Sequence, residues 1–359
     1  MTAGALSRNE KLTMFGLVRF PTFNDRVLAG EIKLKMSTVT AIRNRLKREG
    51  WFRTVRIPYL ERLGGELLIV TTTRLNILKP REELLRTLRE ILGSMDDVFF
   101  ALADTNHVIM FSKCRNYTDA WTDAEKGHQQ LVDKGVLAGR LARKQTVIFP
   151  LNQTKLLRFF DFSNILNQQY GLEYPVLDPP VNVKLETPGP RRLSRIEKRV
   201  YLGLVRHPDH VDNDVARKIG VTRQSVTKIR KRLESEGLLS TIRVPDLQKT
   251  GLEILAMSHY EALPGATLAA RKKGIERVLK EMPSFFHVFG QREGVVIGLA
   301  ASFTDLHRRQ YEASKMYLER GYFKDEPTLT LLSVQDLAVV KDFTFAPLVK
   351  RVLQITDEK

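Results

Sequence analysis

The chain has 359 residues, of which 43% are hydrophobic, and a formal net charge of +17. This length exceeds one ordinary domain core, so we expect two to four packed domains. The longest apolar runs, such as 295–301, are far shorter than the roughly 18 to 20 residues of a membrane span, and we expect a soluble cytoplasmic protein. The only cysteine, Cys114, excludes an internal disulfide framework and a cysteine-clustered zinc site.

The first predicted domain covers residues 8–63. Apolar residues at helical spacing predict a first helix that ends before Pro21, because a proline disfavours helical conformation in the residue that precedes it. A short helix over 25–32 follows, and a third helix comes next with Ser37 as its candidate N-cap. Residues 51–58 then alternate like a strand. Three helices followed by a β-ribbon are typical of a winged helix-turn-helix.

The second predicted domain covers residues 64–170 and has the element order βαββαβ. This order is typical of a ferredoxin-like domain. The elements are a strand, a helix, a hairpin, a second helix and a last strand, at 66–75, 81–92, 98–111, 117–134 and 145–150. A proline-rich segment at 171–192 follows, which we interpret as an extended, semi-stiff linker.

The same organisation then occurs a second time. Residues 16–68 align without a gap to residues 203–255, with 23 identities in 53 positions. We therefore predict a tandem duplication, with a second winged helix at 193–249 and a second ferredoxin-like domain at 250–356. In this copy Ser194 and Glu197 form a capping-box pattern, and Thr222 is the expected N-cap of the third helix. The fold class is thus α+β, with two winged helix-turn-helix domains each followed by a βαββαβ domain.

The positive charge is concentrated in the two predicted winged helices. Residues 8–56 hold 12 Lys and Arg against 4 Asp and Glu, and residues 191–243 hold 14 against 6, so each segment carries +8. The remaining segments are nearly neutral. A charge asymmetry that follows a repeated motif favours phosphate binding over a merely solvated surface.

The second copy resembles the Lrp/AsnC, or feast/famine, transcription regulators. The resemblance depends on 193–197 at the start of the first helix, 214–222 through the turn, and a third helix with Val226, Ile229 and Leu233. It implies a DNA-binding winged helix and an effector and oligomerisation module of βαββαβ order. Members of that family usually carry one of each, whereas this chain carries both twice. The resemblance therefore implies a covalent pseudo-dimer.

Within each third helix we expect one face to pack in the core and the opposite face to contact DNA. Arginines on the flanks and on the following strand are expected to contact phosphates or the minor groove. The candidate DNA-binding residues of the first copy are Ser37, Thr38, Thr40, Ala41, Arg43, Asn44, Arg45, Arg48, Arg53 and Arg56. Those of the second copy are Arg223, Gln224, Ser225, Thr227, Lys228, Arg230, Lys231, Arg232 and Arg243.

The sequence shows none of the common catalytic motifs. There is no glycine-rich phosphate loop, nucleophile elbow or His-Glu-x-x-His pattern, so we expect no enzyme, no cofactor and no metal. The favoured function is a sequence-specific regulator that binds double-stranded DNA in the nucleoid. Two alternatives stay open: a nucleoid-organising protein of low sequence specificity, and a metabolite sensor whose winged helices contact proteins. A homo-oligomer formed through the ferredoxin-like domains and a small-molecule effector are further partners to test.

Overall fold

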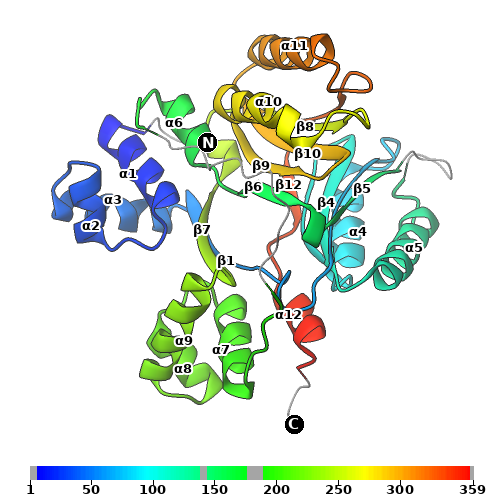
Figure 1. Ribbon diagram of the computed structural model, residues 1–359. Helices are drawn as coiled ribbons and strands as arrows, with labels where there is room; N and C mark the ends of the chain where they lie inside the picture. Colours follow the sequence, from blue (N-terminus) through cyan, green and yellow to red (C-terminus); the bar gives the residue numbers. More distant parts are fainter. Residues whose placement is uncertain (1–5, 138–143, 176–188, 356–359) are drawn as a thin grey trace. The chain divides into compact units, whose positions relative to one another are not determined.

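The computed structural model describes residues 6–137, 144–175 and 189–355 (Figure 1). Within these ranges the chain is a mixed α/β protein with twelve α-helices and two five-stranded antiparallel sheets. In the same ranges, none of the helices has the length and apolar character to cross a membrane. Most of the predicted proline-rich linker lies outside the described residues.

The chain forms two compact units, and each unit is assembled from three separate stretches. Unit 1 consists of Met1–Thr54, Lys155–Lys184 and Thr241–Gln335. Unit 2 consists of Val55–Thr154, Leu185–Ser240 and Asp336–Lys359. The chain passes from one unit to the other within β1 (Phe52–Pro58) and again within β7 (Leu239–Pro245). Each unit therefore combines the helices of one sequence repeat with the sheet of the other.

Unit 1 begins with α1 (Arg8–Arg19), α2 (Asp25–Glu31) and α3 (Met36–Arg48). The Glu10 carboxylate accepts a hydrogen bond of 2.8 Å from the backbone N–H of Ser7, which stabilises the start of α1. The expected N-cap of α3 is wrong: Lys35 holds the extended N-cap conformation and Ser37 lies inside the first turn. Val39 and Leu46 are fully buried, as the predicted core face requires.

Unit 2 contains the corresponding helices α7 (Arg195–Arg206), α8 (Asp212–Ile219) and α9 (Arg223–Ser235). Here the predicted caps are confirmed. The Glu197 carboxylate accepts from the Ser194 N–H at 2.8 Å, and the Thr222 hydroxyl accepts from the Ser225 N–H at 3.2 Å. The buried face of α9 consists of Val226, Ile229 and Leu233.

The sheet of unit 2 comes from the first half of the chain and has the predicted βαββαβ order. Its elements are β2 (Leu67–Arg74), α4 (Arg81–Gly93), β3 (Val98–Ala103), β4 (His107–Cys114), α5 (Tyr117–Asp133) and β5 (Lys144–Pro150). The strand order is β5-β2-β4-β3, followed by β12 (Ala338–Lys341) at the edge. Leu88 and Leu92 of α4 pack with Ala101 and Val108 of the sheet.

The sheet of unit 1 comes from the second half and repeats this arrangement. Its elements are β8 (Ile254–Glu261), α10 (Leu268–Glu281), β9 (Ser284–Phe289), β10 (Glu293–Ala300), α11 (Phe303–Glu319) and β11 (Thr328–Ser333). The strand order is β11-β8-β10-β9, with β6 (Lys155–Phe159) at the edge.

Two short strand and helix pairs, which the sequence pattern did not predict, complete the units. After β6 comes α6 (Ser163–Tyr170), which packs on α1, and after β12 comes α12 (Ala346–Leu353), which packs on α7. Phe162 stacks on Phe285 at 4.6 Å in unit 1, and Phe345 stacks on Phe99 at 4.7 Å in unit 2. Each edge strand therefore joins a sheet built from the other half of the chain.

A buried cation secures each edge strand. Arg158 of β6 is 3% exposed and donates to the Leu279 carbonyl at 2.9 Å and to the Ser284 hydroxyl at 3.0 Å. Lys341 of β12 donates to the Leu92 carbonyl at 2.7 Å, and burial lowers the pKa of its ammonium group. Leu279 and Leu92 lie near the ends of α10 and α4, where helix carbonyls have no helical partner. Each cation thus joins an edge strand to a helix end.

We expect Arg158→Met to lower the free energy of unfolding by about 3 kcal/mol, because it leaves buried carbonyl groups without a donor. Urea unfolding followed by circular dichroism measures this. The control is Arg308→Ala in the same unit, whose side chain is 73% exposed. Equal stability of the two variants would show that the buried guanidinium does not secure β6.

Candidate functional site

One cavity of unit 2 lies between α5 and the face of the sheet. It has a volume of about 520 Å³. That size is within the roughly 300 to 1,000 Å³ of small-molecule sites. The sheet contributes a floor of Ile69, Thr71, Met110 and Ile148, and α5 forms the opposite wall. The cavity belongs to one unit and is built only from the first half of the chain.

Two aromatic side chains of α5 stand at this cavity. Tyr117 is 59% exposed and Trp121, one helical turn later, is 63% exposed. Gly127 on the same helix lets α5 approach the sheet domain, since a Cβ there would lie 2.5 Å from the Met95 methyl carbon. His128 also lines the cavity and is half-buried. The arrangement is an apolar recess with an aromatic rim, which suits a flat ligand.

Burial shifts the pKa values of the acidic and basic groups at the cavity in opposite directions. Burial raises the pKa of Asp97, which is 5% exposed, and the nearby Asp123 adds to this effect. Burial lowers the pKa of Lys144, although Glu125 and Asp97 act in the other direction. The Cys114 thiol lies 3.9 Å from the Asp97 carboxylate, and burial raises its pKa too. Burial thus shifts the pKa values of Asp97 and Lys144 in the directions that favour their neutral forms.

The corresponding place in unit 1 is filled. Tyr260, Tyr317 and Phe323 occupy it, with ring centroids of Tyr317 and Phe323 4.2 Å apart, and only about 20 Å³ is left. His287, which is fully buried there, has its pKa lowered to about 3 by burial and by the nearby Arg158. In the aligned first half, Thr73 and Leu131 take the positions of Tyr260 and Tyr317. The smaller side chains explain why this place is open in unit 2.

The predicted DNA-contacting residues do not all face outward. In unit 1, Asp25 of α2 accepts hydrogen bonds from Thr40 at 2.8 Å and from Arg43 at 2.6 Å. In unit 2, Asp212 of α8 likewise accepts from Thr227 at 2.8 Å and from Arg230 at 2.9 Å. Each aspartate and the threonine and arginine that donate to it are identical in the two repeats. The same contact therefore joins the second and third helices in both units, and this explains part of the identity between the repeats.

The flanking arginines are also paired. Arg45 forms a 3.6 Å ion pair with Glu49 and contacts Glu10, and Arg232 contacts Glu197. Glu10 and Glu197 are the capping-box residues of α1 and α7. The expected positioning role of these arginines therefore competes with a role in holding α3 and α9 on the first helices.

Arg56 and Arg243 lie inside the protein, at 8% and 5% exposure. Arg56 donates to the carbonyls of Leu204 at 3.3 Å and His210 at 3.2 Å, and Arg243 donates to the Leu17 carbonyl at 2.9 Å. Their expected entry into a minor groove is therefore wrong for this conformation, since both guanidinium groups are enclosed.

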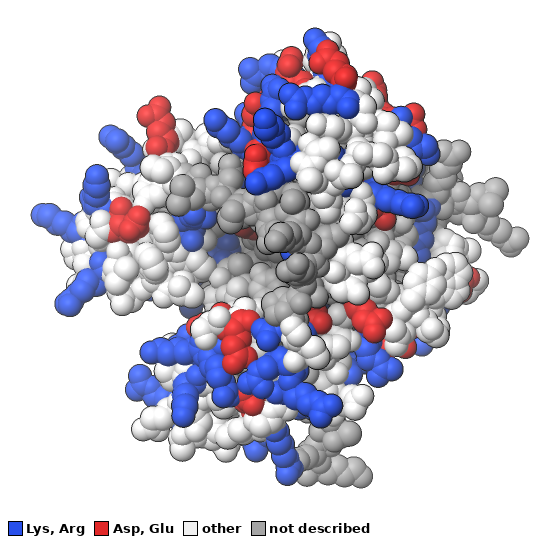
Figure 2. Space-filling model, viewed as in Figure 1, with Lys and Arg blue, Asp and Glu red and all other residues white. Residues whose placement is uncertain are grey.

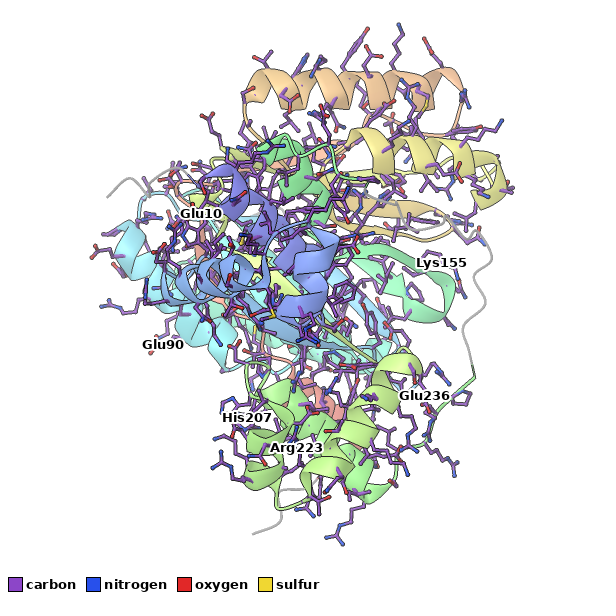
Figure 3. The ribbon with its side chains drawn as sticks, turned by 90° about the vertical axis from the view of Figure 1, so that its left-hand side faces the viewer. Glu10, Glu90, Lys155, His207, Arg223 and Glu236 are labelled. Carbon is purple, nitrogen blue, oxygen red and sulfur yellow. The ribbon has the colours of Figure 1, made fainter. Side chains whose placement is uncertain are left out.

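The predicted DNA-contacting residues that are exposed differ between the two units. On α3 the exposed predicted residues are Ser37, Ala41, Asn44 and Arg48. On α9 they are Arg223, Gln224, Lys228, Lys231 and Arg232. Thr38, Arg53 and Ser225 are half-buried. Figure 2 shows Lys and Arg side chains gathered over the part of the surface formed by α7, α8 and α9, and Figure 3 labels Arg223 at the start of α9.

Sequence reasoning missed the cavity. Tyr117, Trp121, His128 and Lys144 belong to no recognisable sequence motif, so the sequence pattern did not mark them as site residues. The available signal was the replacement of Thr73 and Leu131 by tyrosines in the second half, a gain of bulk at two positions of one domain. The sequence alone does not indicate that the two positions are neighbours, and only the fold shows that both lie at the same cavity site.

Comparison with solved structures shows what shares this fold. The siroheme decarboxylase NirDL matches with a TM-score of 0.50 and 11% identity, over 96% of this chain and 98% of that chain. Its complex with an iron-uroporphyrin III analogue also matches at 0.50 and 11%, over 95% and 99%. AsnC of E. coli matches over 40% of this chain and 92% of its own, with 17% identity and a TM-score of 0.28. No family model and no curated protein sequence matches the chain.

These comparisons overturn the expectation that the chain is not an enzyme. The structure that shares its fold over nearly the full length of both chains is a decarboxylase. The absence of a familiar motif was therefore no ground for excluding catalysis. A likeness of 11% identity establishes the fold and leaves the activity to be argued from the residues.

The half-buried Asp212 carboxylate gives a test of the contact between α8 and α9. Burial by itself would raise the pKa of Asp212, but hydrogen bonds from Arg230 and Thr227 outweigh it and lower the pKa below 3.8. The stabilisation is therefore present above pH 3.8 and is lost as the pH falls through the lower folded pKa. We expect Asp212→Asn to cost about 1 to 2 kcal/mol at pH 7 and to reduce the acid sensitivity.

Urea unfolding at neutral and acidic pH measures this effect. Asp214→Asn on the same helix is the control, because its partner Arg217 is 74% exposed and such pairs contribute little. If Asp212→Asn showed the same pH dependence as the unsubstituted protein, the carboxylate would not be the source of it.

Proposed function

We propose that unit 2 binds a planar, carboxylate-bearing ligand of the tetrapyrrole class in the cavity beneath α5 and removes a carboxyl group from it. The observation that carries this proposal is the open 520 Å³ cavity with an aromatic rim, beside its filled counterpart in unit 1. The ligand class is supported by the solved complex of NirDL with an iron-uroporphyrin III analogue, a protein of the same fold.

The residues of the cavity fit such a ligand in two ways. Tyr117 and Trp121 present exposed rings on which a flat conjugated molecule would stack. Lys144 supplies a cation for a carboxylate, and the mainly apolar floor disfavours that carboxylate's charge. A substrate group that loses its charge during the reaction would gain from these surroundings.

Loss of carbon dioxide from an acetate side chain needs one proton. The bond between the methylene carbon and the carboxylate carbon breaks, CO₂ leaves, and the electron pair stays on the methylene carbon next to the conjugated ring. That carbon then takes a proton and becomes a methyl group. Lys144 is the candidate acid, because burial lowers the pKa of its ammonium group and makes the proton easier to release. His128 is the second candidate on the cavity wall.

Iron-uroporphyrin III is the probe for this proposal. Its visible absorption measures binding, and mass spectrometry of the recovered ligand measures the loss of CO₂. We expect Trp121→Ala to weaken binding about tenfold, the effect of losing roughly 1.4 kcal/mol of aromatic contact. Lys144→Arg should keep binding and stop the loss of CO₂, since a guanidinium holds a carboxylate but does not release its proton.

The matched control is Phe303→Ala, at the position of α11 that aligns with Tyr117. Phe303 is 60% exposed and belongs to unit 1, in which the corresponding site is filled, so its loss should not change binding. Equal effects of Phe303→Ala and Trp121→Ala, or no binding by the unsubstituted protein, would contradict the proposed site. Binding without loss of CO₂ would contradict only the reaction.

Nucleic-acid binding is the second candidate, favoured by the exposed basic face of α9. We propose that α7–α9 and β7 at 193–249 form a winged helix-turn-helix and that α1–α3 and β1 at 8–63 form its duplicate. The βαββαβ segments at 64–170 and 250–356 are the proposed ferredoxin-like domains. Arg223, Gln224, Lys228 and Lys231 are the proposed contacts to duplex DNA, whereas α3 offers mostly uncharged residues.

Removing Lys228 and Lys231 together tests this second candidate. We expect the double alanine variant to bind duplex DNA about tenfold more weakly and to reduce the log-log salt slope by about 2, because two phosphate contacts are lost. Lys272→Ala with Lys273→Ala, two exposed lysines of α10, controls for total charge. Identical salt slopes for the two double variants would exclude α9 as the contact surface.

A further inference from the structure

A second cavity of unit 2, unrelated to the one beneath α5, is strongly basic. This groove has a volume of about 840 Å³ and lies along α7, between the end of α8 and the residues that follow α12. Its lining includes Leu202, Ile219 and Ile355, and among the described residues that line it there is no aspartate or glutamate. The six cations that line it are Arg195, Lys198, Arg199, Arg206, Arg217 and Lys218.

The geometry of α7 puts four of these cations in a row. Arg195, Lys198, Arg199 and Arg206 lie at helical spacing on one side of the helix. The first and last are eleven residues apart, which corresponds to about 16 Å along an α-helix. A row of this length matches an elongated anion with several charges better than a single small ion.

The cations of the groove create a positive electrostatic potential, and two of them also donate hydrogen bonds to neighbouring backbone carbonyls. The pKa of His207, labelled in Figure 3, is lowered by burial first and then by Lys218 and other nearby cations. Arg199 donates to the Ile219 carbonyl at 2.6 Å and thereby offsets the negative end of α8. Lys198 donates to the Leu353 carbonyl at 2.8 Å, which holds the end of α12 beside the groove.

The corresponding place in unit 1 is filled and much less basic. There the aligned residues Leu12 and Glu31 stand where Arg199 and Lys218 stand in unit 2. Tyr174 occupies the space, with its ring 5.0 Å from the ring of Phe15 and its hydroxyl bonded to Glu31. The basic groove is therefore a property of unit 2 and not a general consequence of the repeated helices.

We propose that this groove binds the oligophosphate chain of a small molecule, with the phosphates along α7 and the apolar residues Leu202, Ile219 and Ile355 next to its remaining part. Guanidinium and ammonium groups form their strongest hydrogen bonds with phosphate and carboxylate oxygens. The shared chemistry is a chain of phosphates, which a nucleoside triphosphate and inorganic tripolyphosphate both supply. The recess is favoured over an exposed helix face because it brings cations from two helices to one ligand.

The test uses isothermal titration of the full chain with tripolyphosphate and with ATP. Arg206→Ala combined with Lys218→Ala should weaken binding of both at least about tenfold, the loss of two charge-assisted contacts. The matched control is Arg86→Ala with Arg89→Ala, two exposed arginines of α4, which removes the same charge from the same unit and should leave binding unchanged. Tighter binding of ATP than of tripolyphosphate would identify a nucleotide as the source of the phosphates.

The proposal would be overturned if neither probe bound to the unsubstituted protein. It would also be overturned if both double variants weakened binding equally, or if the groove substitutions left the binding of both probes unchanged. Circular dichroism and thermal unfolding establish that the variants fold. Binding of duplex DNA that depends on Arg206 and Lys218, without binding of tripolyphosphate or ATP, would assign the groove to nucleic acid and would also overturn it.

Discussion

The architecture depends on the addition to each sheet of one strand from the other half of the chain. Without β6 on β9 and β12 on β3, the outer edges of β9 and β3 would be unpaired, and Phe162 and Phe345 would lose their stacking partners. Arg158 and Lys341 make this strand pairing specific, because a buried cation requires carbonyl groups at defined places. The same strands then lead into α6 and α12, which pack on the first helix of each three-helix group.

The two units show how a repeated fold can diverge in its cavities without changing its elements. Beneath α5, threonine and leucine leave a space that two tyrosines fill in the other unit. Along α7, arginine and lysine line a groove that a tyrosine fills beside α1. In both cases unit 2 is open and unit 1 is closed by aromatic side chains. This asymmetry directs the search for ligands to one unit.

Much of the secondary structure could be predicted from the sequence, because helical periodicity, prolines and caps are local. Ser194 and Thr222 correctly marked the residues that precede α7 and α9. The β6–α6 and β12–α12 pairs were missed, since their partners lie more than a hundred residues away in the sequence. The surface of α9 was predicted in part. The burial of Arg56 and Arg243 was not, because nothing local distinguishes an exposed arginine from one that is buried against the helices of the other sequence repeat.

The interleaved path of the chain also affects how the molecule can be made and divided. Neither half of the sequence contains a complete unit, since unit 1 needs residues up to Gln335 and unit 2 needs residues from Val55 onward to the last helix. During synthesis the first three helices and the first sheet therefore wait for partners that emerge much later. For the same reason, two separately produced halves would each lack what the other supplies. Their association would rebuild both units, so the chain is suited to complementation between fragments rather than to isolation of single domains.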